Sequence, residues 1–269
     1  MRLAALAALL LVSGCPHGDT PRPSGPAPTA AEVVDRLTRA RDEARSFTGE
    51  AVMEYWLNGD RFKGDVRAMG EAGAKVRVAA LSPAGGSPVA EMACDGNQFV
   101  SINYQNNCAL TGPCNKHSIA TFFGIELAPD DFLHLALGTP PVIGEPAGQV
   151  TWDGSKGAYR VELTGADGKQ TIWFAEHGPQ WDVVESELIG PDGRQAWSVK
   201  NAAFDTAKDP AGVDHRVPGK SRFVAPNQQK ADLTVEWHER TVNATIDPSK
   251  FTLAVPAGLP ACGRAAPRK

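Results

Sequence analysis

Two pairs of side chains have the types and spacing that acid–base chemistry needs. Asp131 and His134 lie one helical turn apart, and Glu185 and Glu187 would share one face of a strand. The catalytic and phosphate-binding motifs G-x-S-x-G, S-x-x-K, H-E-x-x-H and the phosphate loop are absent from the sequence. We therefore predict an exposed ion pair for Asp131 and His134, a solvated strand face for the glutamates, and a protein that is not an enzyme and carries no cofactor.

The first residues of the chain have the features of an export signal. Arg2 supplies a positive charge, residues 3–12 form an uninterrupted apolar run, and the small residues Ser13 and Gly14 follow. Such a run matches the apolar region of a secretory signal and is too short to cross the ~30 Å core of a bilayer. Residues 1–14 are therefore predicted to be a signal peptide.

The end of this segment carries a reactive side chain. Val12-Ser13-Gly14-Cys15 resembles the lipobox of bacterial lipoproteins. The resemblance implies cleavage before Cys15, attachment of diacylglycerol to its sulfur, and a third acyl chain on the new amino terminus. Acyl anchors of this kind hold a protein on a membrane because each buried CH₂ contributes about 0.8 kcal/mol. The alternative is an ordinary signal peptide with an incidental cysteine.

Four further cysteines, Cys94, Cys108, Cys114 and Cys262, lie in the body of the chain. An even number in an exported protein predicts two disulfides, for which three connectivities are open. The turn-prone stretch between Cys108 and Cys114 favours that local pair, which would leave Cys94 to bond Cys262. A metal site is the weaker alternative, because no C-x₂-C motif occurs and His117 is the only histidine near the cysteines.

Composition separates an N-terminal tether and a short tail from one folded domain. Residues 15–28 are rich in proline and poor in apolar residues, so they are predicted to be a solvated tether that spans about 40 Å if it is extended. The folded domain is expected over residues 29–262, and a flexible tail over residues 263–269. The chain has 27 Lys and Arg against 31 Asp and Glu, which argues against a nucleic-acid partner and a polybasic membrane patch.

The sequence predicts a domain that is mainly β with few helices. Thr29 and Glu32 form a capping box before an apolar stripe at helical spacing, and Asn58-Gly59 is a strong hairpin signal. Short helices are predicted at 118–123 and 129–137, with Gly138 as the residue after the second. Alternation predicts strands at 47–57, 61–68, 76–80, 89–94, 98–104, 158–164, 171–175, 181–189, 195–204, 221–225, 232–237 and 251–255. This pattern predicts a large curved sheet or an open barrel.

Several short segments resemble the outer-membrane lipoprotein receptor LolB and the wider LolA/LolB superfamily. They are Leu81-Ser82-Pro83-Ala84-Gly85, Asp95-Gly96, Thr121-Phe122-Phe123-Gly124-Ile125, Asp131-Phe132-Leu133, Leu137-Gly138-Thr139-Pro140-Pro141 and, resembling the last strand of the superfamily, Asp247-Pro248-Ser249-Lys250-Phe251 with Val255-Pro256. The resemblance implies an incomplete antiparallel β-barrel of about eleven strands, wrapped over a helical lid, with an apolar cavity for acyl chains. It also implies a membrane-touching loop at Pro83, Ala84 and Gly85, although Ala84 stands where the receptor has a large apolar residue.

Alternating apolar residues are candidates for the wall of that cavity, and plain core packing is the alternative for each of them. The candidates are Met53, Tyr55, Phe62, Val66, Val161, Leu163, Leu233, Val235 and Trp237. The resemblance implies acyl chains or lipoproteins as ligands, a periplasmic carrier protein as a partner, and a lipid-anchored place on the periplasmic side of the outer membrane. Pro16 is not the Asp that signals inner-membrane retention in enteric bacteria. The alternatives are a platform for envelope assembly or sensing, and an envelope hydrolase.

Overall fold

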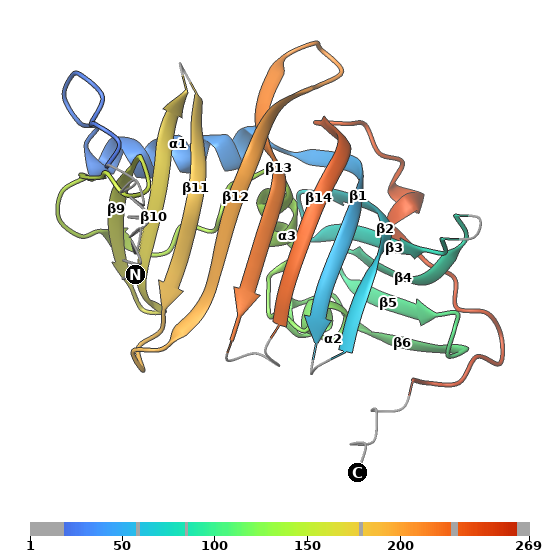
Figure 1. The fold of residues 1–269 in the computed structure, drawn as a ribbon. Coiled ribbons are helices and arrows are strands. Elements are labelled where there is room, and N and C mark those ends of the chain that lie inside the picture. The colour runs from blue at the N-terminus through green and yellow to red at the C-terminus, as the bar shows by residue number, and fades with distance from the viewer. Residues whose placement is uncertain (1–18, 58–59, 84–85, 178–179, 227–230, 263–269) are drawn as a thin grey trace, which may run out of the picture.

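The computed structural model describes residues 19–57, 60–83, 86–177, 180–226 and 231–262, and the strands among them form a single 14-stranded sheet (Figure 1). Every strand pairs with its neighbours in antiparallel fashion. The strands are β1 (Ser46–Leu57), β2 (Asp60–Glu71), β3 (Lys75–Leu81), β4 (Pro88–Asp95), β5 (Gln98–Asn103), β6 (Cys108–Pro113), β7 (Glu145–Pro146), β8 (Thr151–Asp153), β9 (Ala158–Gly165), β10 (Gly168–His177), β11 (Gln180–Ile189), β12 (Gln195–Lys208), β13 (Asp214–Ala225) and β14 (Ala231–Val242).

The sheet is open, as the sequence predicted, and it has more strands than the expected eleven. Its order runs from β6 through β1 and β14 to β7, so the first and last long strands pair at its centre and β6 and β7 form the edges. Leu57 pairs with Asp60, as a β1–β2 hairpin requires, while the predicted turn at Asn58-Gly59 lies outside the described residues. At the β6 edge, Cys262 N–H donates to the carbonyl oxygen of Ala109 at 2.9 Å, so the end of the described chain covers it.

The N-terminal helix α1 (Ala30–Glu43) confirms the predicted capping box. The Thr29 side chain accepts a hydrogen bond from the Glu32 backbone, and the Glu32 carboxylate accepts one from the Thr29 backbone. The two bonds satisfy donors that the first helical turn leaves without partners. Val33 and Leu37 on the inner face of α1 are buried against the sheet.

The predicted last strand over residues 251–255 is wrong. Pro248–Phe251 forms a 3₁₀ helix, η1, and the residues from Thr252 to Val255 pair with no strand. The Asp247 carboxylate accepts a hydrogen bond from Ser249 N–H at 2.9 Å and so caps η1, while Phe251 is buried. Local capping by Asp247 and the fixed backbone angle of Pro248 outweigh the apolar alternation that suggested a strand.

The two disulfides are present, but their predicted pairing is wrong. Cys94 bonds Cys114 and Cys108 bonds Cys262, with Cα–Cα distances of 5.5 and 4.9 Å. Strand β6 was not expected, and it separates Cys108 at its start from Cys114 just beyond its end. Because a strand rises about 3.3 Å per residue, these two cysteines lie roughly 20 Å apart and cannot bond each other.

Apolar side chains form two cores on the face of the sheet that the helices cover. The larger core lies between the central strands and the short helices α2 (Lys116–Phe123) and α3 (Pro129–Ala136) (Figure 1). The smaller lies between α1 and strands β9 to β11. None of the helices in the described ranges is long and apolar enough to cross a bilayer.

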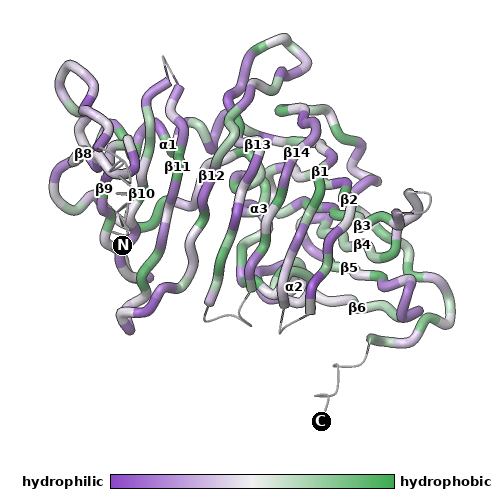
Figure 2. Tube along the Cα trace, in the orientation of Figure 1, coloured by the Kyte–Doolittle hydropathy of each residue, from purple (hydrophilic) through white to green (hydrophobic). Residues whose placement is uncertain are grey.

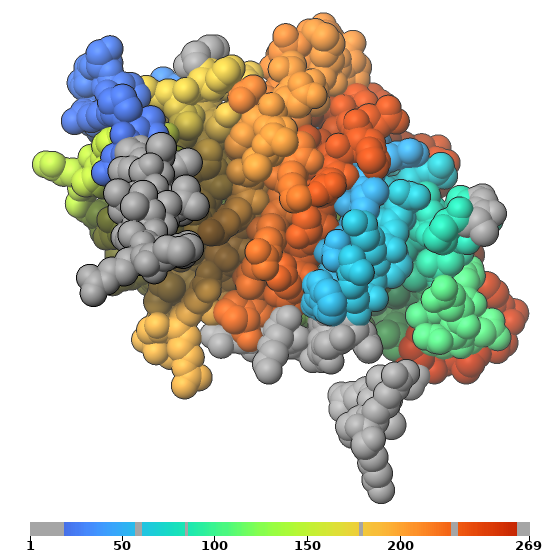
Figure 3. Space-filling model, viewed as in Figure 1, coloured from blue at the N-terminus to red at the C-terminus, as the bar shows by residue number. Residues whose placement is uncertain are grey.

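The opposite face of the sheet is polar. Arg67 pairs with Glu50 at 2.8 Å and Arg61 with Glu54 at 2.7 Å between β1 and β2, and Figure 2 shows hydrophilic residues alternating with apolar ones along these strands. In the space-filling view β12 to β14 and β1 lie side by side as one surface (Figure 3). Ion pairs between neighbouring strands lie on this face, whereas both apolar cores lie on the helix-covered face.

Candidate ligand cavity under the helical lid

Helices α2 and α3 form a lid over the central strands. Asn115 caps α2, because its side chain accepts hydrogen bonds from His117 and Ser118 N–H, and Gly124 ends α2 in the left-handed region with φ of 73°. Pro129 occupies the first turn of α3, and Gly138 follows that helix with φ of 86°. Both helices and the role of Gly138 were predicted, because capping residues and helix-ending glycines act locally.

A small apolar cavity of about 70 Å³ lies between this lid and the sheet. Ser221 and Trp237 are the lining residues whose side chains carry a polar group, and the other lining side chains are apolar. The residues that line it are Met53, Val66, Ala68, Val78, Phe123, Leu127, Phe132, Leu135, Ala136, Val199, Ser221, Phe223, Leu233, Val235 and Trp237. Typical ligand pockets measure about 300–1,000 Å³, so the lid must move before this space can take an acyl chain.

Five of the nine sequence candidates line this cavity. They come together because Met53 of β1 pairs with Val235 of β14, with Val66 on β2 close by. They are Met53, Val66, Leu233, Val235 and Trp237. Of the remaining four, Tyr55 and Phe62 pack against the larger core with ring centroids 5.3 Å apart, and Val161 and Leu163 lie in the smaller core.

The lid side chains were not among the sequence candidates. Phe123 of α2 stacks on Phe132 of α3 with ring centroids 5.6 Å apart, and Leu135 lies beside them in the cavity lining. The apolar spacing of Phe132, Leu135 and Ala136 is the signal that could have identified one inner face of α3. What these residues face depends on the fold and cannot be read from that spacing.

Polar contacts at both ends of α3 join the lid to its neighbours. Arg41 of α1 donates from Nη2 to Oδ1 of Asp131 at 2.7 Å. Asp130 Oδ1 accepts from the backbone N–H of Ala74 at 2.7 Å. Arg240 of β14 donates from Nη1 to the carbonyl oxygen of Ala136, at the end of α3, at 2.8 Å. The first contact and the placement of His134, described next, show that the predicted Asp131–His134 ion pair is wrong.

Two titratable groups sit in the apolar surroundings of the lid. His134 is buried, and its Nδ1 has no hydrogen-bond partner in the described part of the chain. Burial, together with the charge of Arg41, lowers the pKa of His134 from 6.5 to about 4, so the imidazole is neutral at pH 7. Burial also lowers the pKa of Arg240 to about 10, and its guanidinium lies 5.1 Å from the ring centroid of Trp237.

Neither candidate acid–base pair from the sequence forms a catalytic arrangement. The Glu185 carboxylate forms ion pairs with Lys156 and, at 3.4 Å, with Lys200, so it serves as a structural counter-ion. Among the described residues, no group of three or more His, Cys, Asp or Glu side chains is placed to hold a metal ion.

The remaining sequence candidates concern the membrane. Pro83 is exposed, and Ser82 N–H donates to the Ser87 carbonyl oxygen at 2.8 Å to close the loop between β3 and β4. Ala84 and Gly85 lie outside the described residues, as does Cys15.

Comparisons with known proteins support the fold. No protein-family model matches this sequence, and no curated protein sequence matches it. A LolA superfamily protein from Nitrosomonas europaea is 12% identical with a TM-score of 0.53, over 84% of this chain and 99% of that one. A DUF1329 family protein from Desulfovibrio piger is 11% identical with a TM-score of 0.54, over 84% and 98%.

A third similar structure is a putative outer membrane lipoprotein-sorting protein domain from Vibrio parahaemolyticus. It is 9% identical with a TM-score of 0.50, over 82% of this chain and 95% of that one. At such low sequence identity, a match over nearly the whole length of three solved structures shows that this chain shares their fold. The chain therefore has the fold of the LolA superfamily and of lipoprotein-sorting domains.

Proposed function

We propose that this protein is a non-enzymatic envelope lipoprotein that binds acyl chains, of lipids or of other lipoproteins, between its sheet and its lid. The observation that carries the proposal is the cavity under α2 and α3, whose lining is apolar apart from Ser221 and Trp237. Each CH₂ of an acyl chain that leaves water stabilises the complex by about 0.8 kcal/mol, so an apolar cavity wall favours binding of such a chain. The likeness to lipoprotein-sorting domains supports the same class of ligand.

We further propose that the indole N–H of Trp237 becomes a hydrogen-bond donor to the ligand when the lid opens. The Nε1 atom of Trp237 is buried and has no hydrogen-bond partner among the described residues, and the Trp237 side chain lines the cavity. An unsatisfied buried donor costs about 1–3 kcal/mol. The ester or amide carbonyl at the head of an acyl chain would accept this hydrogen bond, and binding would then recover that cost.

Ligand entry requires the lid to open. Phe123, Phe132 and Leu135 line the space that an acyl chain would take. The polar contacts of α3 at Asp130, Asp131 and Ala136 are non-covalent and can break when the lid opens. A ligand that binds the open form more tightly than the closed form shifts the population towards the open form. The difference between the two binding free energies sets the size of this shift. Opening of the lid is therefore part of the proposed binding reaction.

The proposed location follows from the N-terminal sequence. Acylated Cys15 would anchor the protein to the outer membrane, and the proline-rich segment that follows would hold the domain on the periplasmic side. A periplasmic carrier protein that delivers acylated cargo is the expected partner. We place the membrane contact at the loop of residues 82–87, and such a contact agrees with a role in lipoprotein localisation.

A second candidate function is a protein-binding platform in envelope assembly or sensing. The volume of about 70 Å³ favours it, because a filled interior needs no ligand. The two functions differ in whether the purified protein carries acyl ligand.

Native mass spectrometry tests the proposal. The protein is secreted into a bacterial periplasm with a cleavable, non-lipidating leader in place of residues 1–15 and purified without detergent. We expect mass additions that match fatty acids or phospholipids. Val235→Phe, which fills the cavity, should remove them, and Thr234→Phe, on the opposite face of β14, should keep them. Ligand-free protein, or equal loading of both variants, would favour the platform.

A further inference from the structure

The predicted tether, residues 15–28, is attached to the folded domain near its own start. The backbone N–H of Thr20 donates to the carbonyl oxygen of Gly154 at 2.9 Å, and Nε1 of Trp152 donates to the carbonyl oxygen of Thr20 at 2.9 Å. Both backbone groups of Thr20 therefore bond to the β8–β9 turn, at one end of the sheet (Figure 2). The tether is thus fixed at Thr20, before α1 begins at Ala30.

Two glycines make room for the tether at this turn. A Cβ atom on Gly154 would lie 2.8 Å from Cβ of Asp19, and one on Gly157 would lie 3.2 Å from Oγ1 of Thr20. Carbon atoms pack best at about 3.5–4.0 Å, so a side chain at position 154 would displace Asp19. The backbone of Gly154 is not in the left-handed region, so the close approach of Asp19 is the feature that favours glycine there.

Contacts within the domain hold the turn in shape without the tether. Oδ2 of Asp153 accepts a hydrogen bond from Nε1 of Trp173 of β10 at 3.0 Å. The indole ring of Trp152 packs edge-on against the buried ring of Tyr159, with ring centroids 5.0 Å apart. The turn therefore offers the tether a preformed donor and a preformed acceptor.

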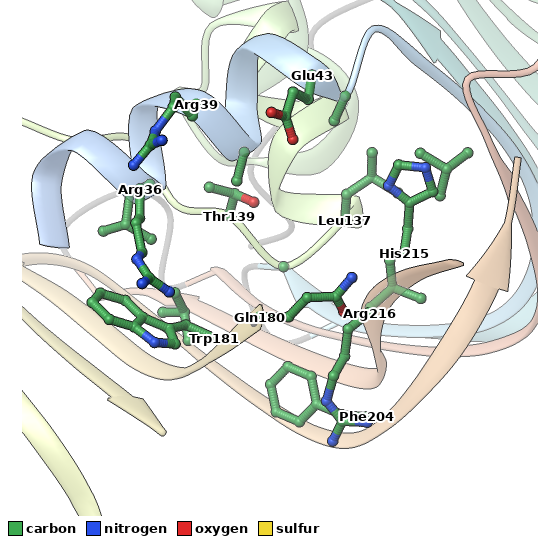
Figure 4. A pocket seen from close by; sticks show the side chains of 17 residues that line it. Arg36, Arg39, Glu43, Leu137, Thr139, Gln180, Trp181, Phe204, His215 and Arg216 are labelled. Carbon is green, nitrogen blue, oxygen red and sulfur yellow. The ribbon is translucent and has the colours of Figure 1, made fainter. Parts of the chain in front are cut away.

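The described part of the tether after Thr20 is closed between two fixed points. Residues 21–26 are exposed, and Ala27 packs against the smaller core. Helix α1, which follows, is fixed on the sheet, where the Arg36 guanidinium lies 4.3 Å from the ring centroid of Trp181 of β11 (Figure 4). The residues before Thr20 alone then set the distance between the domain and an anchor on Cys15.

That distance is short compared with the sheet. The four residue steps from Cys15 to Asp19 span at most about 14 Å, whereas the whole tether, if undocked, would span about 40 Å. From β9 to β3, which leads into the loop at residues 82–87, the sheet order has eight steps, or roughly 40 Å along the curved sheet. The docked tether therefore holds the β8–β9 turn close to the bilayer and does not hold the far end of the sheet there.

We propose that the β8–β9 turn, with Thr20 docked on it, faces the lipid bilayer that carries the acyl anchor. The proposal rests on the proposed lipidation of Cys15, and it adds the face that the domain turns to the membrane. Lipid headgroups then lie within about 14 Å of Asp19. This contact is separate from the one proposed for the loop at residues 82–87, so the two can be tested independently.

Hydrogen exchange tests the docking of the tether without any lipid, on the non-lipidated protein used for native mass spectrometry. The Thr20 amide should exchange roughly tenfold faster in Trp152→Phe/Gly154→Ala, because about one hydrogen bond is lost. Trp152→Phe alone keeps the ring and should give a smaller increase. The control Trp56→Phe/Gly112→Ala makes the same changes at an exposed tryptophan and at a glycine with no atom within 4 Å of an added Cβ. Equal exchange in all the variants and the wild type would overturn the proposal.

Energy transfer on vesicles tests which end of the domain lies at the membrane. Full-length lipidated protein is reconstituted into vesicles of phosphatidylethanolamine and phosphatidylglycerol that contain an acceptor-labelled lipid. A donor dye on exposed Thr151→Cys in β8 should transfer more energy than one on exposed Asp65→Cys in β2. Trp152→Phe/Gly154→Ala should lower transfer from the first dye towards that from the second, and the control double variant should leave it unchanged.

The outcomes separate this inference from the function on which it rests. Lipidated protein that shows equal transfer from the two dyes, or transfer that the docking variant does not change, overturns the inference and leaves the anchor and the acyl-chain cavity standing. Protein without acyl groups on Cys15 overturns the anchor and the inference together, while native mass spectrometry still tests the cavity.

Discussion

The guanidinium of Arg41 lies 2.7 Å from the carboxylate of Asp131, and this contact joins the N-terminal helix to the lid. The two residues are 90 positions apart in the chain, and both side chains are about four-fifths buried, with exposed fractions of 19% and 22%. Arg41 also donates to the Thr139 carbonyl oxygen at 3.3 Å. Arg41 therefore contacts both ends of residues 131–139, the segment that contains most of α3.

Breaking this contact should loosen the lid. We expect Asp131→Asn to lower the free energy of unfolding by about 1–2 kcal/mol, because it leaves a partly buried charge without its partner. Hydrogen exchange should accelerate in residues 129–136. Glu236→Gln, which removes the carboxylate from an exposed pair with Lys220, is the control and should change neither measurement. Unchanged exchange in α3 would mean that the ion pair does not hold the lid.

Acid should destabilise the closed lid through His134. Its folded-state pKa of about 4 lies below the unfolded value of 6.5, so the unfolded chain takes up the proton first as the pH falls. The stability contribution is complete above about pH 6.5 and declines by roughly 2–3 kcal/mol towards pH 4. Urea unfolding of wild type and His134→Leu across this window measures it, and the variant should decline less. Parallel curves would contradict the assigned pKa.

The disulfide pattern can be checked chemically. Non-reducing peptide mapping should yield peptides that link Cys94 to Cys114 and Cys108 to Cys262. Because the second bond spans 154 residues, removing it with Cys108→Ser/Cys262→Ser should cost about 3–5 kcal/mol by the chain-entropy model. A peptide linking Cys108 to Cys114, or free thiols at these positions, would contradict the structure.

Lipid attachment at Cys15 is a prediction from the sequence alone. Cys15→Ser should abolish acylation and release the protein into the soluble periplasm, or leave its precursor uncleaved. Membrane fractionation with detergent-phase partitioning measures this. If the variant partitions like the wild type, the lipobox interpretation is wrong.

The loop at residues 82–87 offers a test of membrane contact. Ala84→Leu should strengthen vesicle binding of the non-lipidated protein by roughly 1–2 kcal/mol, because more apolar surface leaves water. Ala84→Asp should weaken it, since a carboxylate resists leaving water. Co-sedimentation with outer-membrane-like vesicles compares the three proteins. Equal binding of Ala, Leu and Asp forms would argue against delivery through this loop.

Local chemistry could be predicted from the sequence. The capping box at Thr29 and Glu32 and the helix end at Gly138 depend on residues within one or two turns, and the structure confirms them. Alternation predicted most strands, because neighbouring side chains of a strand face opposite sides wherever the strand pairs. It failed at residues 251–255, where the cap at Asp247 created a 3₁₀ turn instead.

The tertiary structure alone decided which distant residues meet. An even number of cysteines predicted two disulfides, but the unexpected strand β6 determined their pairing. Alternation marked Leu163 and Leu233 equally, yet the first packs under α1 and the second lines the lid cavity. Arg36 and Trp181, or Arg41 and Asp131, share no local signal. Periodicity records which face of an element is buried, whereas its partner depends on the pairing and curvature of the whole sheet.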